Sequence, residues 1–273
     1  MNSAREGSPG WKTGDEMLTK LHGLGNDFLV LLGEGGSPQL ARRACDRHRG
    51  IGADGLIMGR RLSGDPVLSF TLWNADGSEA EMSGNGMRCL AHAALDACWV
   101  EEDQPFGVLT PAGRREVSVR RLDARTTWAS VEMGPVKVKG EADRCNVGHG
   151  QLLVDVGNPH LVVLGRHPAV VDVAGLGAEL SATDPAGLNV EFVALGPGPD
   201  EVTMRVWERG VGETQACGTG ACAAAVAVHH WGRVGASVTV HQPGGAAAVS
   251  IHPDGTVTLT GPSERVAECE LHI

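Results

Sequence analysis

The chain has 273 residues, 42% of them hydrophobic and 21% charged, which is enough for one large or two smaller domains with a substantial core. Its formal net charge of −10 argues against a nucleic-acid-binding protein, because such proteins present a basic face. The sequence contains neither a run of about 20 apolar residues nor an apolar N-terminal segment, so we expect a cytoplasmic protein with no membrane span and no secretory signal.

The predicted elements follow a polar N-terminal segment. Residues 1–16 lack hydrophobic periodicity and are predicted to be a disordered extension, so that the fold starts near Met17. Most of the later elements are short, β-branched strands bounded by turn residues. They are predicted over residues 28–32, 68–73, 116–121, 127–133, 152–156, 161–164, 190–194, 202–207, 237–240, 247–252, 256–260 and 266–273.

Two segments, residues 86–100 and residues 220–231, have helical character instead. Each follows a glycine-rich turn, and each carries alanine and other apolar residues on every side. A helix that is apolar all round is buried on all sides. We therefore expect two central helices, each enclosed by strands.

The surroundings of the two helices match at a nearly constant spacing. Aligning Ser83 with Cys217 gives an offset of 217 − 83 = 134, and at this offset Trp73 falls on Trp207. Farther upstream, GNDFLVL in the first half resembles GNPHLVV in the second. A series of matches in the same order indicates a duplication, and a duplicated unit tends to pack about a pseudo-twofold axis.

Such an axis can bring two helix N-termini to one cleft. Unpaired N–H groups and the positive ends of the helix dipoles would together hold a carboxylate there. Ser83 and Cys217 would each present a side chain, and we predict that Cys217 is partly thiolate because a helix N-terminus lowers a cysteine pKa. Two opposed acid/base groups suit inversion of an amino-acid α-carbon: one removes the α-proton, the other delivers a proton to the opposite face, and the amides stabilise the charge.

No cofactor and no metal are expected. GIGADG at residues 50–55 matches a dinucleotide motif literally, but it lacks the preceding strand and following helix that such a site needs. The pair His229 and His230 has no spaced carboxylates or thiols beside it. The remaining cysteines are interpreted as buried or incidental thiols rather than a disulfide framework; they are Cys45, Cys89, Cys98, Cys145, Cys222 and Cys269.

Several motifs along the chain form a specific set. They read KLHGLGNDF, GIGADGL, NADGSEAEM followed after position 83 by GNGMRC, GNPH, LNVEF and ERGVGETQACGTGACAAA. Together they resemble the diaminopimelate epimerase family, from about Met17 to the GPSE turn near the C-terminus. The resemblance implies conversion of LL-diaminopimelate to the meso form, for lysine and peptidoglycan synthesis, without pyridoxal phosphate or metal. It also implies a small-molecule amino-acid substrate, two domains that close over it, and a possible homodimer.

The resemblance further implies roles for single residues. Arg209 matches the arginine that pairs with the distal carboxylate, and Cys217 matches one catalytic cysteine. His160 and Glu208 match residues that tune the acid/base pair, and Glu208 also belongs to the substrate-binding set. The other substrate-binding positions are the asparagines Asn26, Asn74, Asn158 and Asn189, and the residues around the reacting carboxylate, Gly84, Asn85, Gly218 and Thr219.

Position 83 departs from the family pattern, because Ser83 stands where the second catalytic cysteine is expected. A serine hydroxyl is far less acidic than a thiol, whose reference pKa is about 8.5. It can give a proton to a carbanion but is a poor base without a partner. Three interpretations follow: an introduced serine, a native serine in a slow or direction-biased enzyme, or a different substrate. We favour a variant of the same enzyme, since the residues for the distal end are intact.

The expected fold is α+β, with two pseudo-symmetric domains that are each a curved mixed β-sheet around a buried central helix. The first domain would span residues 17–126 plus the C-terminal strand 263–273, and the second residues 127–262. One alternative is a proline- or hydroxyproline-racemase-like epimerase, against which Arg209 and the asparagines argue. The other is a catalytically silent amino-acid-binding protein, which only Ser83 favours.

Overall fold

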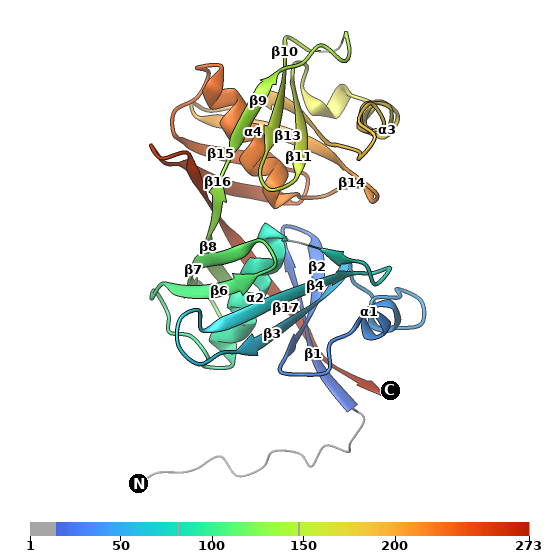
Figure 1. Cartoon of the computed structure of the whole chain (residues 1–273), viewed down its shortest axis with the longest axis vertical. Coiled ribbons are helices and arrows are strands. Elements are labelled where there is room, and N and C mark those ends of the chain that lie inside the picture. The colour runs from blue at the N-terminus through green and yellow to red at the C-terminus, as the bar shows by residue number, and fades with distance from the viewer. Residues whose placement is uncertain (1–14, 81, 147, 273) are drawn as a thin grey trace.

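The computed structural model describes residues 15–80, 82–146 and 148–272 (Figure 1). The predicted N-terminal extension lies outside the described residues, apart from residues 15 and 16, which already belong to the first strand. Two lobes are stacked along the long axis, with α2 (Gly84–Asp96) in one and α4 (Gly218–His230) in the other.

The first lobe is a sheet that closes around α2. Its strands are β1 (Asp15–Gly23), β2 (Asn26–Leu32), β3 (Gly55–Arg61), β4 (Leu68–Asn74), β5 (Glu79–Ala80), β6 (Phe106–Thr110), β7 (Gly113–Arg121), β8 (Thr126–Pro135) and β17 (Thr256–His272). The strands pair in the order β1–β2–β3–β4–β6–β7–β8–β17, and β17 pairs back with β1. The enclosed α2 is buried continuously from Gly84 to Ala94, as its all-round apolar sequence predicts.

The second lobe repeats this plan around α4. Its strands are β9 (Lys137–Glu141), β10 (Gly150–Asp155), β11 (Pro159–Leu164), β12 (Asn189–Leu195), β13 (Glu201–Glu208), β14 (Gly212–Thr214), β15 (Ser237–Gln242) and β16 (Gly245–Ile251). They pair in the order β9–β10–β11–β12–β13–β15–β16–β17, and β17 pairs with β8, which leads directly into β9. The predicted α+β fold of two pseudo-symmetric halves around buried helices is confirmed.

The strand register supports the predicted duplication residue by residue. In the first lobe β2 and β3 are parallel and β3 and β4 antiparallel, and β11, β12 and β13 repeat that sequence of directions. Trp73 pairs with Glu79 as Trp207 pairs with Glu213. Gly25, in the turn between β1 and β2, and Gly157, in the turn between β10 and β11, both adopt the left-handed backbone conformation. Their φ values are 85° and 96°, which favours glycine at each turn.

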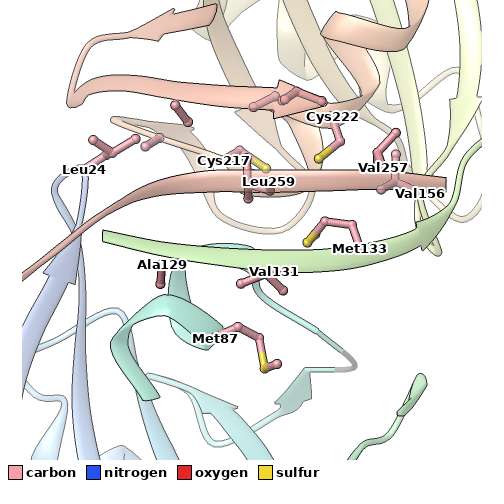
Figure 2. Packing of buried hydrophobic residues seen from close by; sticks show 14 of the residues in the cluster. Leu24, Met87, Ala129, Val131, Met133, Val156, Cys217, Cys222, Val257 and Leu259 are labelled. Atoms are coloured by element: carbon pink, nitrogen blue, oxygen red, sulfur yellow. The ribbon is translucent and has the colours of Figure 1, made fainter. Parts of the chain in front are cut away.

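The two lobes share one hydrophobic core. Strands β8 and β17 lie side by side between them, with Cys217 and Cys222 on one side and Met87 on the other (Figure 2). These residues belong to a single cluster of buried hydrophobic residues that also includes Leu259 on β17. The shared core therefore fixes where the N-terminus of α2 lies relative to that of α4.

Several elements differ from the predicted ones. The short helices α1 (Pro38–Ala44) and α3 (Val173–Ser181) and the 3₁₀ turn η1 (Pro168–Val170) were not predicted. Both central helices begin two residues earlier than predicted, and α2 ends at Asp96 rather than residue 100, because Cys98 adopts a left-handed φ of 57°. The last two predicted strands are one continuous strand, β17.

Candidate functional site

The N-termini of α2 and α4 meet, and each begins with the same cap. The Ser83 hydroxyl accepts a hydrogen bond from the Gly86 N–H at 3.0 Å, and the Cys217 sulfur accepts one from the Gly220 N–H at 3.3 Å. The helices then approach so closely that a Cβ on Gly218 would lie 3.2 Å from the Cα of Gly84. The N–H groups in the first turns of α2 and α4, which lack partners within their own helices, therefore face the same space.

A cavity of about 650 Å³ opens at this junction between the two lobes. Its walls contain nearly the whole predicted site: Asn26, Asn74, Ser83, Gly84, Asn85, Asn158, Asn189, Glu208, Arg209, Cys217, Gly218 and Thr219. The predicted residue missing from these walls is His160, which is fully buried behind Asn158. Residues from both halves of the duplication thus line one space.

The environment of Cys217 contradicts the predicted thiolate. Its side chain is only 5% exposed, and burial raises the pKa of the thiol well above its ordinary value. The negative charges of Glu208 and Glu191 raise this pKa further, whereas the hydrogen bonds with Thr219 and the Gly220 N–H lower it. The expectation from the helix N-terminus was wrong because desolvation and two nearby carboxylates outweigh the helix dipole. The raised pKa favours the neutral thiol at Cys217.

Glu208 lies beside this thiol, which donates a hydrogen bond to the Glu208 carboxylate. Burial raises the pKa of the Glu208 carboxyl, and the charge of Glu191 adds to that increase. Hydrogen bonds from Thr214 and Cys217 to the carboxylate lower the pKa, as does the nearby His160. Burial therefore raises the pKa values of two neighbouring, hydrogen-bonded groups.

His160 is held from both sides. Its Nδ1 lies 2.7 Å from the Glu191 Oε1, and its Nε2 lies 2.9 Å from the Asn158 Oδ1. Glu191, on β12, is also fully buried, and a Cβ on Gly220 would come within 2.8 Å of its Oε1. Glu191 lies in the LNVEF motif but was given no role from the sequence; a carboxylate in an otherwise apolar strand was the available signal.

Hydrogen bonds within each lobe orient the remaining asparagines. Asn26 donates to Asp54 at 2.7 Å, and Asn74 donates to Ser78 at 3.0 Å. Asn189 accepts a hydrogen bond from the backbone N–H of Arg209. Asp54, in the GIGADGL motif, is a lining residue that was given no role, because the motif was rejected as a dinucleotide site and otherwise served only the family resemblance.

Arg209 is exposed at the cavity wall. Its guanidinium donates to the carbonyl of Ala186 at 3.0 Å, and it takes part in no ion pair among the residues that the structure describes. An Arg fork with unused donors suits a carboxylate, which it can bind through two parallel hydrogen bonds.

Within the described ranges, no group of three or more histidine, cysteine, aspartate and glutamate side chains is arranged to hold a metal ion. In the same part of the chain, no helix is both long and apolar enough to cross a membrane. Of the incidental cysteines, Cys45, Cys89 and Cys222 are buried as predicted, whereas Cys98 is exposed.

Comparison with known proteins identifies the family. A family model described as diaminopimelate epimerase matches residues 18–139 and 152–266. The diaminopimelate epimerase of Desulforudis audaxviator is 42% identical, over 91% of this chain and 96% of that protein. That of Synechococcus elongatus is 38% identical, over 91% of this chain and 95% of that protein.

Solved structures share the fold at lower identity. A predicted epimerase from Pseudomonas aeruginosa has a TM-score of 0.72 at 16% identity, over 94% of this chain and 99% of that one. A hydroxyproline epimerase from Agrobacterium vitis with bound trans-4-hydroxy-L-proline has a TM-score of 0.70 at 18% identity, over 96% of this chain and 93% of that one. With the family match over most of its length, the chain belongs to the diaminopimelate epimerase family of isomerases.

Proposed function

We propose that the protein interconverts LL- and meso-diaminopimelate by two-base proton transfer, with Cys217 and Ser83 as the acid/base groups. One observation carries the proposal: both residues cap helices whose N-termini meet at one cavity. A substrate α-carbon held there lies between a thiol and a hydroxyl. Family membership supplies the substrate class, since the relatives with 42% and 38% identity are diaminopimelate epimerases.

The reacting carboxylate is proposed to sit on the free N–H groups of the first turns of α2 and α4, in the backbone of Gly84, Asn85, Gly218 and Thr219. Helix N-termini attract anions through these N–H groups and the helix dipole. When the α-proton leaves, negative charge spreads into this carboxylate, and the same N–H groups stabilise it. The distal carboxylate would be bound by Arg209, and the asparagines on the walls would hold the remaining polar groups of the substrate.

Proton transfer is proposed to begin with the neutral thiol that the cavity favours. Cys217 first passes its proton to the carboxylate of Glu208 and then abstracts the α-proton from one face of the substrate. Ser83 donates its hydroxyl proton to the other face, and the cycle closes when the resulting alkoxide takes a proton from solvent and protonated Glu208 releases its proton to solvent. An alkoxide is much higher in energy than a thiolate, so we expect slower turnover than with a thiol at position 83.

The division of the chain, its location and its assembly are further parts of the proposal. The first half would comprise residues 17–126 and 263–273, and the second residues 127–262, with β8 and the start of β17 forming the seam between the two lobes. The pairing of β17 with β1 over residues 264–272 supports returning the C-terminal strand to the first half. A cytoplasmic location, a role in lysine synthesis and a possible homodimer rest on the family alone.

A substrate comparison tests the proposal against its rivals. The protein is incubated in heavy water with LL-diaminopimelate, L-proline or trans-4-hydroxy-L-proline, and deuterium at the α-carbon is measured by mass spectrometry. We expect exchange with diaminopimelate alone, because Arg209 requires a second carboxylate that the cyclic imino acids lack. Exchange with proline or hydroxyproline would favour the racemase-like alternative, and binding of diaminopimelate without exchange would identify a silent binding protein.

A further inference from the structure

Arg88, on α2, is an arginine buried completely inside the first lobe. Its guanidinium donates to the Asn85 Oδ1 at 2.8 Å and to the carbonyl of Pro262 at 3.2 Å. Gly23 on β1 leaves room for it, since a Cβ there would lie 3.0 Å from the nearest guanidinium nitrogen. Arg88 was given no role from the sequence.

The charge of Arg88 is not balanced by a carboxylate. Among the described residues it forms no ion pair, and its neighbours Cys89 and Cys222 are buried thiols whose pKa values are raised to about 11 and about 12. Burial lowers the pKa of Arg88 to about 10, so the group still carries its positive charge at neutral pH. A buried charge without a partner is costly, and proteins keep one where it has a use.

The hydrogen bonds of Arg88 determine the orientation of two amides on the cavity wall. A guanidinium only donates, so the Asn85 oxygen must face Arg88 and its Nδ2 must face the other way. That Nδ2 donates to the Asn26 Oδ1 at 3.1 Å, and Asn26 in turn donates to Asp54. The donor chain thus runs from a buried cation, through two proposed substrate-binding asparagines, to a carboxylate.

The same amide connects the two halves of the molecule. The Asn85 Nδ2 also donates to the carbonyl of Ala216 at 3.1 Å, and Ala216 directly precedes Cys217. Asn85 and Arg88 are three residues apart on α2 and therefore lie on the same face of the helix. The cation consequently stands one helical turn behind the N–H groups that face the cavity.

We propose that Arg88 is a positioning residue of the active site, which orients Asn85 and Asn26 and places a positive charge behind the carboxylate-binding end of α2. The inference rests on the proposed function of the cavity. The substrate carboxylate would supply the missing counter-charge, and the attraction would grow as negative charge develops in the transition state. Arg88 acts through Asn85 and the local potential, without touching the substrate.

Two variants separate the charge from the hydrogen bond. Arg88→Gln can still donate to Asn85 but has no charge, whereas Arg88→Lys keeps both a donor and the charge. Removing a direct donor to a developing anion costs about 10²–10³-fold in kcat. For a group acting through another residue we expect about a 10–100-fold loss of kcat/KM in Arg88→Gln, mainly in kcat, and about a threefold loss at most in Arg88→Lys.

His92→Gln is the matched control. His92 lies one turn farther along α2, is equally buried, and bonds to the carbonyl of Ser263 as Arg88 bonds to that of Pro262. We expect its melting temperature to fall about as far as that of Arg88→Gln, while kcat and KM stay unchanged. A merely structural role for Arg88 would give the two variants the same kinetics.

Epimerisation and α-deuterium exchange of LL-diaminopimelate are measured in the unmodified protein and all three variants. Folded Arg88→Gln with kcat/KM within about twofold of the unmodified protein would overturn the inference, as would Arg88→Lys slowed more than about tenfold. If Arg88→Gln does not fold, the kcat/KM of Arg88→Lys alone decides whether the inference stands. Absence of exchange in the unmodified protein would overturn the proposed function and this inference together, whereas normal exchange with insensitive variants would overturn the inference only.

Discussion

Replacing Ser83 with cysteine places a thiol at the position equivalent to Cys217. The structure indicates that the replacement fits, because Ser83 and Cys217 make the same cap: one accepts a helix N–H at 3.0 Å and the other at 3.3 Å. Weakening an N-cap costs about 1 kcal/mol of stability. We therefore expect Ser83→Cys to fold, with at most a small fall in melting temperature.

The expected gain in rate follows from the acidity of the new group. Ser83 is only partly buried, whereas Cys217 is 5% exposed, so a thiol at position 83 loses less solvation than Cys217 when it ionises. A positioned general base contributes about 10²–10⁴-fold, or about 3–5 kcal/mol of barrier at 1.36 kcal/mol per decade. We expect Ser83→Cys to raise kcat/KM by about 10²-fold or more.

The assay follows epimerisation in both directions together with α-deuterium exchange. The equilibrium constant fixes the ratio of kcat/KM in the two directions, so both must rise by the same factor. Exchange can differ: in the unmodified protein it should be faster from the isomer whose α-hydrogen faces Cys217, and the two exchange rates should converge in Ser83→Cys.

The control is Ser37→Cys, because Ser37 caps α1 with a 3.1 Å bond from the Leu40 N–H and does not line the cavity. It should leave the epimerisation rate unchanged. A Ser83→Cys protein that turns over no faster than the unmodified one would refute the assignment of position 83 as the second acid/base site.

Three further predictions concern the walls of the site. Burial raises the pKa of Glu208, and its ionised form takes the Cys217 proton, so activity should fall as pH drops through that raised pKa. Glu208→Gln should lower kcat about 10²-fold and remove this acidic limb from the pH–rate profile. The raised pKa also means that ionised Glu208 opposes folding above that pKa, so Glu208→Gln should melt at a higher temperature at pH 7. Arg209→Ala should raise KM, at a cost of about 2–5 kcal/mol once the site closes, with little change in exchange at saturating substrate; an unchanged KM would show that Arg209 does not bind the distal carboxylate. In Gly218→Ala the new Cβ would lie 3.2 Å from the Gly84 Cα. Urea unfolding should therefore show about 1–3 kcal/mol of destabilisation, and α-deuterium exchange should drop about 10²-fold. Normal exchange would mean that the close approach of the two helices is unimportant for the reaction.

The duplication was the part of the fold that the sequence predicted best. Trp73 and Trp207 sit in the same register because the repeat preserves side-chain periodicity as well as spacing. The short helix α1 was missed although Ser37 and Pro38 are favourable at its start, since seven residues are too few to show a helical period. The continuous β17 was divided in two because residues 261–264, GPSE, were interpreted as a turn between its halves.

The composition of the site was easier to predict than its electrostatics. Motif residues such as Asn26 and Arg209 line the cavity because the repeat brings both helix starts together. The ionisation of Cys217 was predicted wrongly, since it depends on how deeply the thiol is buried and on Glu191, a residue 26 positions earlier whose proximity is not encoded in any local pattern. Arg88 was given no role, although the predicted burial of its helix on all sides already implied a buried charge, which is rare in proteins.

Inversion of one α-carbon between Cys217 and a second group on its opposite face is the core of the proposed reaction. It is tested most directly by epimerising LL-diaminopimelate in heavy water and analysing product and residual substrate at early times. Two-base transfer predicts that the meso product carries one solvent deuterium at the inverted carbon, while the recovered LL substrate still carries mostly hydrogen. Meso product that retains the original hydrogen, or exchange that persists undiminished in Cys217→Ala, would contradict the account.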